Sequence, residues 1–146
     1  MAFKFPLAAV LKYREEIEKR EERALECRRE IVVGLEARLA EVRSDRSRTL
    51  LDREVSLKRG ALGDDLHYLI EQQQYLEKLE QQLRREVAAA LVEFDKQMKV
   101  FMAARQKREI LDELKIAQKD KYEEKQERRE QMLIDEMFSA RLHRDT

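Results

Sequence analysis

The sequence predicts an all-α protein: a long antiparallel two-helix coiled-coil hairpin with a C-terminal helical overhang. Turn-forming residues are scarce, because the 146 residues include only 3 glycines and 1 proline. Charged residues make up 42% of the chain, well above the about 25% of an ordinary globular domain. Apolar residues recur at alternating steps of four and three, which is the heptad pattern of a coiled coil. We expect a single coiled-coil domain over residues 1–146.

The composition also excludes several classes of protein. β-Sandwiches, barrels and doubly wound α/β folds need more tight turns than so few glycines and prolines can form. Lys plus Arg and Asp plus Glu both number 31, and hydrophobic residues make up 42% of the chain. This balance disfavours intrinsic disorder and also nucleic-acid binding, which rewards a basic excess. Cys27 is the only cysteine, which excludes a disulfide framework and fits a reducing compartment.

The first helix is expected over about residues 6–59. Pro6 suits its first turn, where a backbone N–H is not needed. Gly60 is placed as the left-handed residue that ends this helix, and the bend of the hairpin is expected at residues 60–63.

The second helix is expected over about residues 64–142, with the acidic pair Asp64 and Asp65 stabilising its N-terminus. It would span roughly 115 Å, against roughly 80 Å for the first helix. If the chain folds back at the bend, residue i faces roughly residue 123 minus i, and the helix after about residue 118 forms the overhang. A parallel or domain-swapped dimer is the alternative, but we expect a monomer. The longest uninterrupted apolar run, Val87 to Val92, is far shorter than the about 20 residues of a membrane-spanning helix.

The heptad positions define a seam on each helix, meaning the row of residues expected to face the other helix. In the second helix the expected seam is Leu62, Leu66, Leu69, Gln73, Leu76, Glu80, Leu83, Val87, Ala90 and Phe94, continuing less strictly through Met98, Phe101, Ala104 and Leu111. In the first helix it is Val10, Tyr13, Ile17, Ala24, Cys27 and Ile31, with Arg20 as a polar break. Two successive four-residue steps, from Ile31 to Leu35 to Leu39, predict a stutter around Gly34. Cys27 is expected to be a small buried side chain.

No arrangement of residues indicates an enzyme. Catalysis needs polar groups that converge in a pocket closed to water, and a two-helix hairpin has no interior for one. His67 and His143 are the only histidines and are expected at opposite ends of the second helix. The sequence contains neither a glycine-rich phosphate loop nor zinc-ligand spacing. We therefore expect no enzymatic activity, cofactor, bound metal or small-molecule substrate.

Two groups of apolar residues exceed what a hairpin can bury. The first, beside the bend, consists of Tyr68, Gln72, Tyr75, Leu76 and Leu79. It either covers the flank of the seam or forms a docking patch for a partner. The second, on the overhang, consists of Met132, Leu133, Ile134, Met137 and Phe138, with Phe3 and Phe5 expected at the same end. It belongs either to a fraying terminus or to a helix that orders against another protein.

Both ends of the chain resemble one known family. The first segment is Phe3-Lys4-Phe5-Pro6-Leu7-Ala8-Ala9-Val10-Leu11-Lys12-Tyr13-Arg14, which is similar to the F-x-F-x-L-x-x-V-L-x-x-R start of flagellar export proteins of the FliJ family. The second is Tyr122-Glu123-Glu124-Lys125-Gln126-Glu127-Arg128-Arg129-Glu130-Gln131-Met132-Leu133-Ile134-Asp135-Glu136, which resembles that family's Y…R-x-E-Q-x-x-x-D-E run. Chain length and the expected hairpin agree with the resemblance.

The resemblance implies a non-enzymatic component of the flagellar type III protein export apparatus. Family members are antiparallel two-helix coiled coils similar to the stalk subunit of rotary ATPases. The implied partners are the hexameric export ATPase, whose assembly and activity the protein would promote, the export gate membrane protein, and substrate chaperones. The implied location is the cytoplasm, peripherally at the inner membrane at the flagellar base. A generic coiled-coil adaptor or self-associating scaffold is the alternative.

By analogy with the stalk subunit, each apolar group receives a hypothetical partner. The residues assigned to the ATPase ring are Phe3, Phe5, Met132, Ile134, Met137 and Phe138. The residues assigned to the gate or to chaperones are Tyr68, Gln72, Tyr75, Leu76 and Leu79.

Overall fold

The computed structural model describes residues 2–60 and 63–145, and these residues form two helices. Helix α1 is Ala8–Lys58 and helix α2 is Gly63–Asp145, and no strand occurs in the described part of the chain. The predicted all-α helical hairpin is thereby confirmed. The predicted seam residue Leu62 and the bend residue Ala61 lie outside the described residues.

Local sequence explains where the helices begin and end. The amide of Ala8 donates to the carbonyl of Phe5 at 3.2 Å, so the first turn forms just after the proline. At the other end of α1, Gly60 has a φ of 71°, a left-handed conformation that glycine adopts without steric cost. Asp64 and Asp65 occupy the first turn of α2, where negatively charged carboxylates interact favourably with the helix dipole and stabilise the helix.

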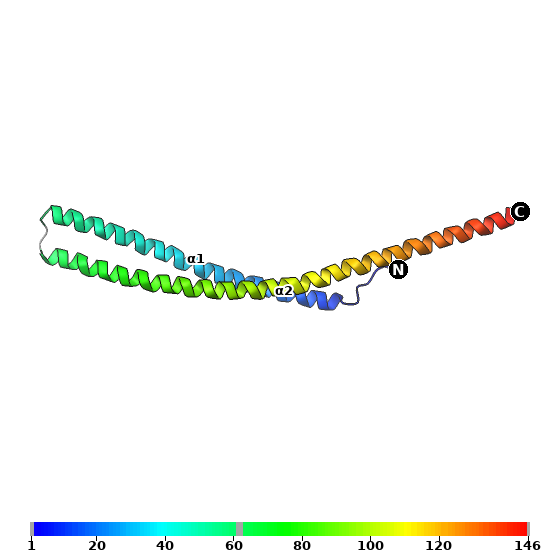
Figure 1. Cartoon of the computed structure of the whole chain (residues 1–146), viewed down its shortest axis with the longest axis horizontal. Coiled ribbons are helices and arrows are strands. Elements are labelled where there is room, and N and C mark those ends of the chain that lie inside the picture. Colours follow the sequence, from blue (N-terminus) through cyan, green and yellow to red (C-terminus); the bar gives the residue numbers. More distant parts are fainter. Residues whose placement is uncertain (1, 61–62, 146) are drawn as a thin grey trace. The chain divides into compact units, whose positions relative to one another are not determined.

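The contacts divide the chain into two units, which are described separately. The hairpin unit is Glu21–Phe101, and the terminal unit combines Met1–Arg20 with Met102–Thr146. Within the hairpin unit the two helices lie side by side (Figure 1). They are antiparallel, because Arg43 pairs with Glu80 whereas Arg53, further along α1, bonds the earlier residue Gln73.

The core of the hairpin unit is a short apolar section of the seam. Its buried residues are Leu39, Val42, Leu76 and Leu83, with Leu35, Leu79 and Val87 packed against them. Leu83 is only 2% exposed. The seam predicted for the second helix therefore matches the burial of α2, including the polar residue Glu80, which is 4% exposed.

The seam predicted for the first helix is wrong, because the true seam lies one residue further along for most of α1. Val10, Tyr13, Cys27 and Ile31 are all exposed. The buried and half-buried residues at alternating three- and four-residue steps are Leu11, Arg14, Glu18, Glu21, Leu25, Val32, Leu35, Leu39, Val42, Arg46, Thr49, Arg53 and Ser56. With the exposed Arg28 between Leu25 and Val32, these positions form an unbroken heptad series. The predicted stutter is absent from it.

In the terminal unit, a small core forms around the start of α1. Phe5, Leu11 and Ala104 are buried. Beside them, the guanidinium of Arg108 donates to both carboxylate oxygens of Glu18, at 2.5 and 3.2 Å, and to Asp112 at 2.6 Å. These carboxylates, Glu18 first, raise the pKa of Arg108 above its usual range. Arg108 therefore stays charged within the seam.

The last part of α2 extends beyond these contacts. The ring of Tyr122 packs against that of Phe3, with centroids 5.6 Å apart. Every residue from 127 to 145 is exposed, and we call this segment the C-terminal extension. In the described part of the chain, neither helix contains a stretch that is both long enough and apolar enough to cross a bilayer.

Candidate functional site

The C-terminal extension carries an apolar face without a covering helix. The residues that form it are Leu133, Ile134, Met137 and Phe138, all exposed. They follow the i, i+3 and i+4 spacing of one helix face. Met132 is also exposed, but it lies about 100° around the helix from Leu133. Leu133 was not assigned to the ATPase-contact set from the sequence, although helical spacing alone identifies it as part of this face.

The structure does not bring the predicted N-terminal contact residues onto that face. Phe5 is 8% exposed, so it belongs to the core of the terminal unit. Phe3 is half-buried and packs on Tyr122. Along α2, Tyr122 precedes Leu133 by roughly 16 Å. The predicted ATPase-contact set therefore separates into an internal aromatic contact and an exposed C-terminal face.

A basic groove surrounds the aromatic contact. Its volume is about 390 Å³. Phe3 and Tyr122 line it together with Lys4, Lys121 and Lys125. An apolar floor with several ammonium groups suits an acidic segment that also carries apolar side chains. The spacing of Lys121 and Lys125, one helical turn apart, is the sequence pattern that could have identified this groove.

The second predicted contact group also divides. Tyr68 and Tyr75 are each 64% exposed, and Gln72 between them is exposed as well. Leu76 is part of the buried core and Leu79 is packed against it. The outward-facing patch therefore consists of the two tyrosines and the glutamine, and the two leucines support it from the core.

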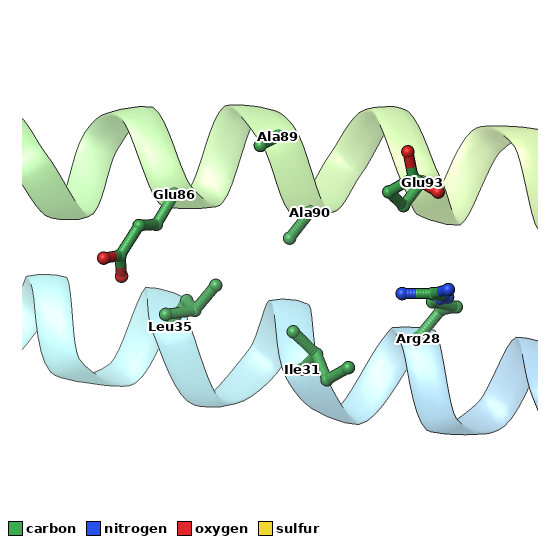
Figure 2. Close-up of a pocket in the computed structure, with 7 residues that line it drawn as sticks. All are labelled: Arg28, Ile31, Leu35, Glu86, Ala89, Ala90 and Glu93. Atoms are coloured by element: carbon green, nitrogen blue, oxygen red, sulfur yellow. The ribbon is translucent and has the colours of Figure 1, made fainter.

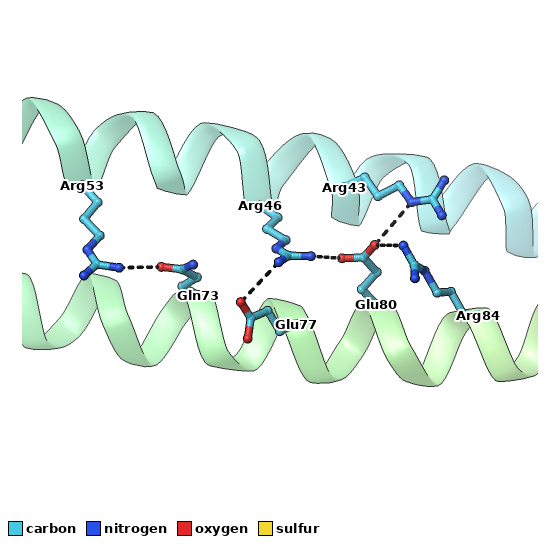
Figure 3. Close-up of polar contacts among 7 residues, drawn as sticks. All are labelled: Arg43, Arg46, Arg53, Gln73, Glu77, Glu80 and Arg84. Atoms are coloured by element: carbon cyan, nitrogen blue, oxygen red, sulfur yellow. Dashed lines mark hydrogen bonds and ion pairs between the residues drawn. The ribbon is translucent and has the colours of Figure 1, made fainter.

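A buried carboxylate lies in the seam of the hairpin unit. Glu80 accepts hydrogen bonds from Arg46 at 2.7 Å, from Arg84 at 2.8 Å and from Arg43 at 3.4 Å (Figure 3). Arg46 also pairs with Glu77 at 3.3 Å. Arg43 and Arg46 come from α1, whereas Arg84 and Glu77 lie on α2. The pairs that Arg43 and Arg46 form with Glu80 and Glu77 link the two helices, at a point where most coiled coils place an apolar side chain.

The arginines set the ionisation of Glu80. The hydrogen bond from Arg46 is the main cause that lowers the pKa of Glu80 below its ordinary value of 4.5, and Arg43 and Arg84 lower it further. Burial acts in the opposite direction. The carboxylate is therefore ionised in the folded protein at neutral pH, and its charge is compensated by the guanidinium groups around it.

The lowered pKa predicts an acid-dependent loss of stability. The pKa of Glu80 is lower in the folded state than in the unfolded state. The ionised carboxylate therefore contributes fully to the free energy of unfolding above pH 4.5, and this contribution is lost as the pH falls through the folded pKa. Between about pH 5 and pH 3, the wild type should lose more thermal stability than Glu80→Gln, which cannot titrate at this site. Thermal unfolding followed by circular dichroism tests this, and equal losses in both proteins would contradict it.

Two further observations concern metal-binding side chains and the cysteine. In the described part of the chain, no three His, Cys, Asp or Glu side chains gather in a way that could hold a metal ion. Cys27, predicted to be buried, is exposed on α1, because the seam passes through the next residue, Arg28.

Comparison with known protein families finds a match. A family model described as "Flagellar FliJ protein" matches residues 3–146, which is essentially the whole chain. No curated protein matches this sequence, and no solved structure matches it either.

Proposed function

This chain belongs to the FliJ family of flagellar proteins, a family of flagellar export components, and we propose that it acts as a stalk-like coiled coil that binds the hexameric export ATPase. In this proposal it promotes assembly and activity of the ATPase ring and performs no chemistry itself. It works at the cytoplasmic face of the inner membrane, at the flagellar base, and is a monomer when alone.

The observation that carries this proposal is the apolar face of the C-terminal extension. Ile134, Met137 and Phe138 are more than half exposed on a helix that no other described segment covers. Large exposed apolar side chains at helical spacing are typical of a helix that docks into a groove of another protein. The basic groove beside Tyr122 supplies a charged contact along the same helix.

The exposed patch of Tyr68, Gln72 and Tyr75 is the proposed contact for the export gate or for substrate chaperones. Tyrosine supplies a large rigid contact area and a polar group, which is why it is frequent in protein interfaces. The two tyrosines lie seven residues apart on α2, so they are about two turns apart on the same side of the helix. The patch and the C-terminal extension share no residue.

The experiment compares two double variants of the full chain. Ile134→Ser with Phe138→Ser should weaken ATPase binding by about 10- to 100-fold, because exposed apolar anchors dominate such interfaces. Stimulation of ATP hydrolysis should fall in parallel. The melting temperature should not change, since both side chains are outside the core.

The matched control is Tyr68→Ser with Tyr75→Ser, which removes a comparable exposed apolar area elsewhere on α2. It should retain ATPase stimulation and weaken binding to the cytoplasmic part of the gate or to a chaperone. If wild-type protein neither binds the ATPase nor stimulates it, the stalk function is wrong. A generic adaptor or self-associating scaffold would then fit better, and a stable dimer at low micromolar concentration would support it.

A further inference from the structure

A second groove lies beside the seam in the hairpin unit. It has a volume of about 310 Å³ and is lined by Arg28, Ile31, Leu35, Glu86, Ala89, Ala90 and Glu93. Figure 2 shows Ile31, Leu35 and Ala90 directed into the space between the two helices. The groove is lined mainly by apolar groups, and it is distinct from the surfaces proposed above to bind the ATPase and the gate.

Small side chains on α2 create this groove. Ala89 and Ala90 offer only methyl groups to the space that Ile31 and Leu35 face from α1. Ile31 is 48% exposed, although it lies next to the buried seam residue Val32. An isoleucine in this position has one side packed and one side in water, which favours burial against a further apolar surface.

An apolar side chain stands seven residues before the groove on α1 and another stands seven residues after it on α2. Ala24 precedes Ile31 by seven residues on α1, and Val100 follows Glu93 by seven on α2. Ala24 is half-buried and Val100 is exposed. Residues at this spacing form a straight line along a coiled coil. A helix laid alongside the pair would follow this line, with Glu93 between the apolar groups on α2.

The charges around the groove indicate which helix would fit. Glu86 and Glu93 stand on α2, seven residues and about 10.5 Å apart. Their hydrogen-bond partners are Gln82 at 3.3 Å and Lys96 at 3.4 Å, both exposed and on the same helix. Such contacts are weak and readily exchanged. Arg28 stands on the α1 side, opposite Glu93 (Figure 2).

We propose that this groove binds an amphipathic helix of another protein as the third strand of a coiled coil. The helix places a leucine-sized apolar side chain on Ile31, Leu35 and the alanines. It carries Lys or Arg seven residues apart to pair with Glu86 and Glu93. The proposal does not depend on the ATPase contact, because the groove and the C-terminal extension share no residue.

The probe is a designed fluorescent peptide: a helical heptad sequence with leucine at its apolar positions and two lysines seven residues apart. A matched peptide carries glutamates at those two positions. Fluorescence anisotropy measures binding of each peptide to the full chain. The lysine peptide should bind the wild type at least 10-fold more tightly than the glutamate peptide. Raising the salt concentration should reduce the difference.

Two variants locate the binding. Glu86→Lys with Glu93→Lys should reverse the preference, so that the glutamate peptide becomes the tighter ligand. Ile31→Ser should weaken binding of both peptides at least 10-fold with only a small loss of melting temperature, because the Ile31 side chain is half exposed. ATPase stimulation should be unchanged in both variants, which separates a failure here from a failure of the stalk function.

Several results would overturn the proposal. One is the lack of saturable binding of the lysine peptide up to about 1 mM, a limit that corresponds to very weak association. Equal binding of the two peptides, or binding that Ile31→Ser does not affect, would also overturn it. So would a concentration-dependent dimer that Ile31→Ser dissociates, since the occupant would then be a second copy of this chain.

Discussion

Leu83→Ala is expected to lower the free energy of unfolding by about 2–5 kcal/mol, the usual cost of removing a buried leucine side chain. Leu83 is 2% exposed and belongs to the core of the hairpin unit with Leu39, Val42 and Leu76. Urea unfolding followed by circular dichroism measures the change.

The matched control is Leu91→Ala, on the same helix but 41% exposed. It removes the same atoms from a site that is partly in water, so the loss should be under about 1 kcal/mol. Alanine also has the higher helix propensity, which offsets part of that loss. Equal effects of the two variants would show that Leu83 is not a core residue, and the assignment of the α2 seam would be wrong.

Glu80→Lys is expected to be comparably destabilising, by about 3–5 kcal/mol, because it places a cation among three arginines in the seam. The carboxylate that compensated Arg46 at 2.7 Å and Arg84 at 2.8 Å would be lost. Arg43 and Arg84 are both more than half exposed and can turn toward water, whereas Arg46 is less exposed. The loss should be evident in both the urea midpoint and the melting temperature.

Replacing both partners separates the cost of a broken ion pair from the value of the intact pair. The double variant Arg46→Leu with Glu80→Leu exchanges two charged groups for apolar ones that can pack in the seam. It should be neutral or more stable by about 1–4 kcal/mol, as found for buried ion pairs in other proteins. A double variant that is as unstable as Glu80→Lys would mean that the ion pair itself stabilises the hairpin strongly.

The fold class and the seam of α2 could be predicted from the sequence because apolar side chains occupy most of that seam. Leu66, Leu69, Leu76 and Leu83 follow one another at steps of three, seven and seven, and no competing series on α2 is as regular. The left-handed Gly60 could be predicted for a similar reason, since glycine adopts that conformation more readily than any other residue.

The seam of α1 could not be found from hydrophobicity, because more than half of its positions are polar. An apolar series lies one residue before the true seam, and hydrophobicity alone therefore predicts it as the seam. It consists of Val10, Ile17, Ala24 and Ile31. The polar seam residues pair across the hairpin instead, as Glu18 does with Arg108 and Arg53 with Gln73. Searching for complementary side chains near residue 123 minus i would have revealed them.

The exposure of the candidate contact residues could be predicted only in part from their helical positions. Tyr68 and Tyr75 are exposed as expected for residues outside the seam. The burial of Leu79 could not be predicted from its position around the helix alone, because it depends on which α1 side chains lie opposite it. Phe5 was misplaced because it precedes the regular helix, where periodicity gives no direction for a side chain.

The C-terminal extension has a consequence for how tightly a partner can bind it. A separate 19-residue helix in water would be only marginally stable, because forming its first turn is unfavourable. Here the extension continues α2 without a break to Asp145, so nucleation has already occurred elsewhere in the helix. The bond from Gln131 to Asp135, at 3.1 Å, adds local support. A partner therefore meets a helix that is already ordered, and little of the binding free energy is consumed by folding it.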